Sequence, residues 1–298
     1  MTRRPESLAD ALEQSIRDVL GNAFRLASSA LPPPNSSGMV AGHGQRLFGK
    51  FMPAAQADRL DAEADGLGAI ATTGAIRTPA VVARGEAGGV AWLILEWLDL
   101  VPIADDATAG RAAEAVAAMH RVEGEHFGWH RSNFIGATPQ ANHESDNWSR
   151  FFALQRLQPQ FALAAANGHG GALQKDGRRV VERLPALFLD ERPRPSLLHG
   201  DLWHGNLAAL ADGTPVTFDP ACYHGDHEAD IAMSELFGGL PFAFYAQYRR
   251  SMPLSTDYEI RKQLYNLYHI LNHLNLFGRG YLSQASRMAG QLRESLGR

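Results

Sequence analysis

The fold of this chain is predicted first from the stretch PSLLHGDLWHGNLAALADGTPVTFDPA, residues 195–221. Within it, Asp212-Gly213 is a strong signal for a two-residue β-turn between two short strands. With these two residues as the turn, Asn206 on the first strand faces Asp219 on the second, because opposed residues in a hairpin lie close together. Asp201 lies on the preceding loop, five residues before Asn206, and can reach the same point.

An Asp, an Asn and a second Asp that meet at one point form an oxygen-rich site suited to Mg²⁺. The spacing Asp-x4-Asn, followed by an Asp at a strand end, is also that of the catalytic loop of kinases. In that loop the first Asp accepts the proton of the substrate hydroxyl, and the other two side chains hold metal bound to the phosphates of ATP. The alternative explanation is that these residues only form turns, in which Asp and Asn are common.

Kinase chemistry also needs a cation on the nucleotide phosphates, held by a carboxylate. Only three of the 28 basic residues are lysines, and one of them, Lys50, falls in the predicted strand 46–52. In the helix expected after it, Glu63 shares a face with Leu60 and Leu67 by helical spacing. A carboxylate on an apolar face needs a partner. The sequence therefore predicts a Lys50–Glu63 ion pair, and it places the other two lysines, Lys175 and Lys262, on the surface.

Composition excludes several classes of protein. The 298 residues carry a formal net charge of −4, which argues against a nucleic-acid-binding protein. No apolar run is long enough to span a membrane, and the N-terminal residues lack the apolar region of a secretory signal. Cys222 is the only cysteine, so neither an intrachain disulfide nor a thiolate-rich zinc site can form. We expect a cytoplasmic protein that binds neither nucleic acid nor membrane.

The order of the expected elements indicates an α+β protein. A helix over 7–20 precedes a strand-rich region with one main helix, and the sequence is mostly helical after residue 100. The strands are expected over 24–28, 38–41, 46–52, 80–83 and 90–96. The helices are expected over 54–70, 107–121, 148–167, 177–188, 228–237, 256–277 and 281–296. We therefore predict two lobes, residues 1–100 and 101–298, that share a hinge near residues 99–103.

At this point the sequence resembles a known family. The motifs LLHGDLW-x-GN, FDPACY-x-G-x-x-EADIAM and FGG are similar to those of the fructosamine (ketosamine) kinases, within the aminoglycoside-phosphotransferase-like kinases. Further resemblance lies in FGWHRSNFIGATPQANHESDNW, FFALQRLQPQ and NHLNLFGRGY. It is dense over 127–281, sparser over 50–99 and poor before Lys50. The resemblance implies a two-lobed protein-kinase-like fold, with a small N-terminal sheet, a helical C-terminal lobe, and ATP and Mg²⁺ as cofactors.

The same resemblance implies roles for individual residues. Asp201 would be the catalytic base, Asn206 and Asp219 the magnesium ligands, and Lys50 with Glu63 the phosphate-anchoring pair. The interlobe hinge, with backbone groups that bind adenine, would be Glu96-Trp97-Leu98-Asp99. Family members phosphorylate the C3 hydroxyl of a sugar-derived ketosamine on a lysine or a small amine. The phosphorylated adduct falls apart and restores the amine, so the expected role is deglycation repair.

One departure from the family concerns the turn that covers the ATP phosphates. The family has a Gly-Gly-polar-Asn turn there, whereas this chain has three prolines, at 32–34, which donate no N–H groups. Phosphate contact would then fall to Asn35, Ser36, Ser37 and Gly38. On the catalytic loop, Trp203 and His204 are candidates for lining the sugar site.

The histidines and acids of this region have other possible roles. His199 is expected to hold the catalytic loop, and Asp230 to tie the helix near 228 to it. Three functions stay open beside the main one: a kinase of another small alcohol or an aminoglycoside, a pseudokinase that binds a partner, and a metal hydrolase. The hydrolase would need His199, His204 and His224 to converge.

Overall fold

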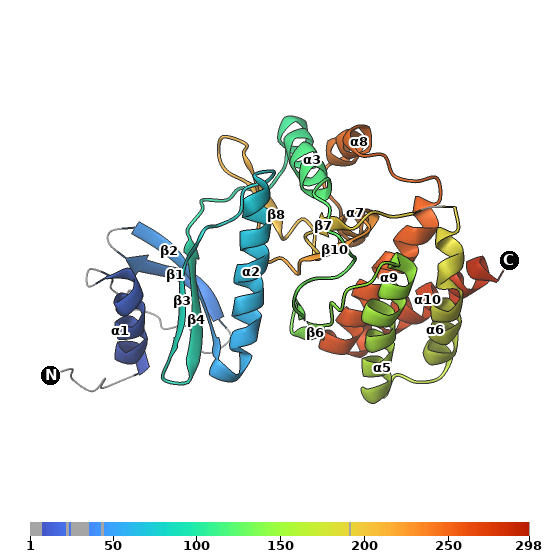
Figure 1. Ribbon diagram of the computed structural model, residues 1–298, viewed down its shortest axis with the longest axis horizontal. Coiled ribbons are helices and arrows are strands. Elements are labelled where there is room, and N and C mark those ends of the chain that lie inside the picture. Colours follow the sequence, from blue (N-terminus) through green and yellow to red (C-terminus); the bar gives the residue numbers. More distant parts are fainter. Residues whose placement is uncertain (1–7, 22–23, 25–35, 43–44, 191, 298) are drawn as a thin grey trace.

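The computed structural model describes residues 8–21, 24, 36–42, 45–190 and 192–297. Its N-terminal part is an antiparallel sheet in the order β1-β2-β4-β3 with helices on both faces (Figure 1). The strands are β1 (Ser36–Gly42), β2 (Gln45–Pro53), β3 (Val81–Ala87) and β4 (Val90–Glu96). The helices are α1 (Leu8–Leu20), the 3₁₀ turn η1 (Ala54–Gln56) and α2 (Ala57–Thr73).

The central strand β4 explains why a helix packs on each face of the sheet. Its residues alternate between the two faces of the sheet, yet nearly all of them are apolar and buried. Trp92 and Ile94 pack in one cluster with Ile16 of α1, whereas Leu93 packs on the other face with Leu60 of α2. A strand that is covered on both sides loses the apolar–polar alternation of a half-exposed strand.

The C-terminal part is mostly helical and also contains three two-stranded ladders (Figure 1). The ladders pair β5 (Asn133–Ile135) with β6 (Thr138–Gln140), β7 (Ser196–Leu198) with β10 (Tyr223–Gly225), and β8 (Leu207–Ala209) with β9 (Pro215–Thr217). The α-helices are α3 (Asp106–His120), α4 (Trp148–Phe151), α5 (Gln158–Ala166), α6 (Ala172–Arg183), α7 (Glu228–Leu236), α8 (Phe242–Ser251), α9 (Tyr258–Phe277) and α10 (Leu282–Leu296). Shorter helical segments are the π-helical η2 (Phe152–Leu157) and the 3₁₀ turns η3 (Leu184–Phe188) and η4 (Arg279–Tyr281).

The expected helices correspond to helical elements, with three differences. The helix expected over 148–167 consists of α4, η2 and α5 in succession, the helix expected over 177–188 begins at Ala172 and continues as η3 after Arg183, and α8 was not expected. The ladder β5–β6 and strand β10 were not expected either, because each strand has only three residues. The strand predicted over 24–28 lies outside the described residues except for Phe24. The lobe division at residues 100 and 101 stays a prediction.

The predicted register of the β8–β9 hairpin is wrong by one residue. Leu207 pairs with Thr217, and the backbone N–H of Phe218 donates to the carbonyl of Asn206, so Asn206 faces Phe218 and not Asp219. The cause is the turn: a three-residue loop, with Gly213 at φ 80°, replaces the two-residue turn.

Helix α2 joins the two parts of the molecule. The Asp65 carboxylate accepts hydrogen bonds from the indole N–H of Trp129 and from Nε2 of His130. One residue further, a Cβ at Gly66 would touch Cys222, so the helix approaches the C-terminal part closely. No helix in the described ranges is long and apolar enough to cross a membrane.

Candidate active site

A cavity of about 330 Å³ lies between α2, the sheet and the loop after β7. Residues from both parts of the molecule line it. From the N-terminal part these are Lys50, Met52, Arg59, Ala62 and Glu63; from the C-terminal part, Asn133, Phe134, Gly136, Asp201, Trp203, Asn206, Asp219, Pro220 and Ala221. Six predicted site residues therefore lie in one cavity, although they come from segments far apart in the sequence.

Lys50 is the centre of the charged wall. Its Nζ lies 2.6 Å from Oε1 of Glu63 and 2.6 Å from Oδ1 of Asp219, and the Lys50 and Glu63 side chains are only 12% exposed. Burial disfavours the ammonium, but the charges of Glu63 and Asp219 outweigh it and raise the pKa of Lys50. The predicted Lys50–Glu63 pair is present, and Lys50 also bridges the two parts of the molecule.

Asp201 and Asn206 line the cavity from the C-terminal part of the molecule. The Nδ2 of Asn206 donates to the backbone carbonyl and to Oδ2 of Asp201, at 2.9 and 3.1 Å. Burial raises the pKa of Asp201 to about 7, the hydrogen bond from Asn206 opposes that rise, and the charges of Asp230 and Asp219 add to it. A buried carboxylate with a raised pKa is well suited to accept a proton near neutral pH.

A buried scaffold holds the loop that carries Asp201. The carboxylate of Asp230, on α7, accepts the backbone N–H groups of His199 and Gly200 at 2.7 and 2.9 Å, and it also contacts His120. The N–H of Asp201 donates to Nδ1 of His199, which leaves Nε2 protonated to donate to the carbonyl of Phe218. Burial lowers the pKa of His199, which keeps the ring neutral. Both residues thus have the loop-holding contacts expected from the sequence.

The backbone on either side of this scaffold is tightly constrained. Gly200 has φ 82°, and a Cβ there would overlap the carbonyl oxygen of Ala221. Asp219 has φ 57°, a conformation that is uncommon for any residue with a side chain. In the part of the chain that the structure describes, no other non-glycine residue has positive φ. Such strain is often found at functional sites.

Sequence reasoning missed a network of buried amides behind Asp219. Asn133 Nδ2 donates to the carbonyl of Cys222 at 2.7 Å, and Gln140 Nε2 donates to Asn133 Oδ1 and to the carbonyl of Ala221. The hydroxyl of Tyr268, on α9, in turn donates to Gln140 Oε1. The ladder β5–β6 carries both amides and so fixes the segment that follows Asp219. The Gly136-Ala137 pair between the two triplets was the available signal for this hairpin.

Several predicted site residues do not line the cavity. His204 is exposed, whereas the neighbouring Trp203 lies at the cavity wall and packs against Phe237. Ser37 and Gly38 lie in β1 opposite Lys50 and Gly49, and the other members of the predicted phosphate turn lie outside the described residues or have no described side chain. The part that Ser37, Gly38 and His204 play in binding stays a prediction.

The predicted hinge begins at the last residue of β4, Glu96, and continues beyond the end of the strand. The carboxylate of Glu96 pairs with Arg77 and so does not face the cavity. Trp97 donates its indole N–H to Asp99. In the chain as described, the backbone groups of Leu98 and Asp99 have no hydrogen-bond partner, which leaves them free for a ligand. Their contact with adenine stays a prediction.

The donors at the cavity suit a magnesium ion. Because Nδ2 of Asn206 points to Asp201, its Oδ1 is left on the other side of the amide, and the Asp219 side chain is 50% exposed. Both supply hard oxygen atoms. Among the described residues, no group of three or more His, Cys, Asp or Glu could hold a metal. A metal here would need further oxygen ligands, such as phosphates and water, and the alternative of a histidine metal hydrolase finds no support.

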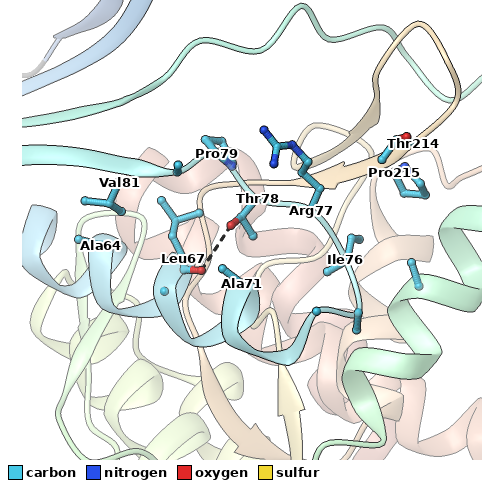
Figure 2. A pocket seen from close by; sticks show the side chains of 15 residues that line it. Ala64, Leu67, Ala71, Ile76, Arg77, Thr78, Pro79, Val81, Thr214 and Pro215 are labelled. Carbon is cyan, nitrogen blue, oxygen red and sulfur yellow. Dashed lines mark hydrogen bonds between the residues drawn. The ribbon is translucent and has the colours of Figure 1, made fainter.

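A larger cavity, of about 710 Å³, lies elsewhere (Figure 2). It is bounded by α2, the segment 74–81 and the tip of the β8–β9 hairpin, and apolar side chains such as Leu67 and Ile76 line most of it. The Thr78 hydroxyl faces the carbonyl of Leu67 there. None of the predicted site residues lines this cavity, so size alone does not identify the site.

Comparison with known proteins shows similarity over most of the chain. The model of the fructosamine kinase family matches residues 10–295, so it also includes the region before Lys50, where the motif resemblance is poor. A probable ketoamine kinase of Synechocystis is 46% identical over 248 residues, which is 83% of each chain. The chloroplastic protein-ribulosamine 3-kinase of Arabidopsis thaliana is 39% identical over 231 residues, 76% of this chain and 69% of that one.

A solved structure agrees over nearly the whole chain. The putative fructosamine-3-kinase of Haemophilus somnus superimposes with a TM-score of 0.86 and 27% identity, covering 96% of this chain and 97% of the other. The expected two-lobed, kinase-like α+β fold is thereby confirmed.

Proposed function

This chain belongs to the fructosamine kinase family, and from that premise we propose that it transfers the γ-phosphoryl group of ATP to the C3 hydroxyl of a ketosamine. Fructosamine and ribulosamine are the substrate classes that its relatives' names give. The observation that supports the proposal is the convergence of Lys50, Glu63, Asp201, Asn206 and Asp219 on one cavity. A pseudokinase is disfavoured because all five polar groups are present.

The chemistry follows from the positions of these groups. Asp201 takes the proton of the C3 hydroxyl while that oxygen forms a bond to the γ-phosphorus, and the bond from this phosphorus to the bridging oxygen of ADP breaks. Lys50 carries positive charge towards the phosphates, and Glu63 keeps its side chain extended in the cavity. Holding the hydroxyl and Asp201 together replaces a bimolecular encounter with an oriented one.

Asn206 and Asp219 are the residues that we propose hold Mg²⁺. The metal, when bound, would neutralise charge on the ATP phosphates. The protein's contribution is to fix the two oxygen donors: the strained backbone of Asp219 is held by the buried amides of Asn133 and Gln140, and Asn206 is held by Asp201.

The remaining assignments complete the proposal. Residues 1–100 form the nucleotide-anchoring lobe, with the backbone of 96–99 on adenine, and residues 101–298 form the lobe that binds Mg²⁺ and the ketosamine. Trp203 is the candidate wall of the sugar site. A cytoplasmic location, in which ATP is abundant, accords with a chain whose single cysteine, Cys222, is a buried free thiol.

The decisive experiment is turnover with defined acceptors. The purified protein with Mg-ATP should form ADP in the presence of fructosyl and ribulosyl amines, and ³¹P NMR should detect a sugar phosphate whose decay releases inorganic phosphate together with the free amine. The unglycated amine and an aminoglycoside are the controls. Comparison of turnover with a glycated peptide and with a glycated small amine shows which kind of amine carries the sugar in the preferred substrate. Absence of ketosamine-dependent ADP formation would refute the proposal.

A further inference from the structure

Arg59 lines the catalytic cavity but has no part in the reaction described so far. It lies on α2 four residues before Glu63, so the two side chains share a face of the helix one turn apart. This places a second cation on the same wall as Lys50, inside the cavity that contains Asp201 and Asp219.

The charge of Arg59 is not matched by an ion pair. Three acidic residues of α2 pair elsewhere, Asp58 with Arg131, Asp61 with Arg84 and Asp65 with His130. Over the described residues, no carboxylate oxygen lies within 4 Å of the Arg59 guanidinium, and nearby Glu63 is itself paired with Lys50. A cation without a counter-ion at a cavity is suited to an anion that enters it.

The guanidinium is also held in place by two hydrogen bonds, and it has further N–H donors without a partner. Its Nη1 donates to Oε1 of Gln56 at 2.8 Å, and its Nη2 donates to the carbonyl of Gly136 at 3.3 Å. Its Nε is fully buried and has no hydrogen-bond partner. A guanidinium has five N–H donors, so three remain, and a buried donor without a partner in a native structure requires an explanation.

We propose that Arg59 binds the phosphoryl group while it moves from ATP to the C3 oxygen, an inference that rests on the kinase function proposed above. Arg59 lines the same cavity as Asp201 and Asp219, so a phosphoryl group that is transferred there lies within reach of its guanidinium. Charge on that group is spread over its equatorial oxygens as the bond to ADP breaks and the bond to the C3 oxygen forms. The planar guanidinium fork matches two such oxygens.

The first test compares two substitutions of Arg59 with a matched control. Arg59→Gln should lower kcat about 100-fold and change KM for the ketosamine only a few-fold, since the contact strengthens in the transition state. Arg59→Lys keeps the charge but loses the fork, and an intermediate loss is expected. Arg84→Gln removes another arginine that contacts α2, remote from the cavity, and should leave kcat unchanged. An Arg59→Gln enzyme with wild-type kcat would overturn the proposal.

The second test needs no acceptor and so separates this proposal from the proposed function. Aluminium fluoride with Mg-ADP mimics a phosphoryl group in transfer, and calorimetry gives the gain in ADP affinity that it causes. The wild-type protein should show a gain that Arg59→Gln loses while keeping its affinity for Mg-ADP. No gain in the wild type, or an equal gain in both proteins, refutes the role of Arg59. A gain without any ketosamine turnover refutes the proposed function alone.

A third measurement excludes a role in recognising the acceptor. If Arg59 instead binds a carboxylate of the substrate, Arg59→Gln raises KM for a glycated amino acid and leaves a glycated amine without a carboxylate unaffected. That result would overturn the proposal, whereas equal losses of kcat for both acceptors support it. If Arg59→Gln fails to fold, the same comparisons of kcat, KM and ADP affinity with the wild type are made for Arg59→Lys.

Discussion

Asp201 is a side chain that the proposed reaction needs but whose burial lowers the stability of the fold. It is buried among Asn206, Asp219 and Asp230, and in the described chain no cation lies within ion-pair distance of its carboxylate. Burying an ionised carboxylate without a cation is unfavourable. Native proteins keep such groups where function needs them.

Replacement of Asp201 by Asn tests whether this carboxylate is needed for catalysis and whether its burial destabilises the fold. The amide keeps the shape of the side chain but cannot accept the proton, so kcat should fall by about 10²–10⁴-fold. Affinity for Mg-ATP should stay within a few-fold, and the melting temperature without ligand should not fall. Activity assays, calorimetry and thermal unfolding measure the three quantities. A collapse of ATP affinity would mean that Asp201 serves as a nucleotide ligand and not as the base.

Substitution of Lys50 and substitution of Glu63 are expected to lower the free energy of unfolding by different amounts. Lys50→Met leaves Glu63 buried without a partner, at a cost of about 3–5 kcal/mol in the free energy of unfolding. Glu63→Gln should cost less, because Lys50 keeps Asp219. The double variant should be more stable than the sum of the two losses predicts, as measured by urea unfolding of all four proteins. The exposed pair Arg84–Asp61 is the control, for which we expect almost no coupling. Equal losses for the two single variants would contradict the asymmetry.

Among whole elements, α7 stabilises the catalytic loop through one carboxylate. In Asp230→Asn one of the two carboxylate oxygens becomes an NH₂ group, which donates and does not accept, so the buried N–H of His199 or of Gly200 loses its partner. The expected loss in the free energy of unfolding is about 1–3 kcal/mol. Turnover should also fall, with Mg-ATP affinity little changed, because the loop that orients Asp201 is loosened.

Urea unfolding and steady-state kinetics measure these effects of the α7 substitution. Asp106→Asn, in the exposed first turn of α3, is the control. If Asp230→Asn loses stability but keeps full turnover, α7 supports the fold without positioning the loop.

The elements also show what local sequence patterns can and cannot determine. Most helices could be predicted because apolar side chains repeat at helical spacing. The β8–β9 register could not, because Asp212-Gly213 fits both a two-residue turn and a three-residue loop with Gly213 in the left-handed region. Helix α8 buries mainly Phe244 and Tyr248, too few positions to give a periodic signal.

For the molecule as a whole, the site depends on contacts between distant segments. Lys50 and Asp219 are 169 residues apart in sequence, yet their side chains are in contact. The motif residues Asp201 and Asn206 were identifiable from spacing. Arg59 and Asn133 were not, since nothing local indicates that α2 and the β5 hairpin meet at the cavity. Lys262 was expected on the surface, but it is partly buried in ion pairs with Glu235 and Glu259, whereas Lys175 is exposed as expected.

The stability of the whole molecule should depend on pH through its buried histidines. Burial lowers the pKa of His227 to about 4 and that of His269 to about 3, against about 6.5 in an unfolded chain. Below pH 6.5 the unfolded chain therefore binds protons that the folded protein does not. Each of these histidines then lowers the free energy of unfolding by about 1.4 kcal/mol for each pH unit between 6.5 and 4.

The difference between variants isolates this contribution from that of the other titrating groups. His227→Gln should reduce the pH slope of the free energy of unfolding by about 1.4 kcal/mol per unit between pH 6.5 and 4.5, measured by urea unfolding at half-unit steps. The substitution also removes the contact with the Tyr248 hydroxyl, which changes stability at all pH values but not the slope. The exposed His204→Gln serves as the control. A slope that His227→Gln leaves unchanged would mean that His227 takes up its proton in the folded protein, and burial among Asp226, Asp230 and Arg261 would then not keep it neutral.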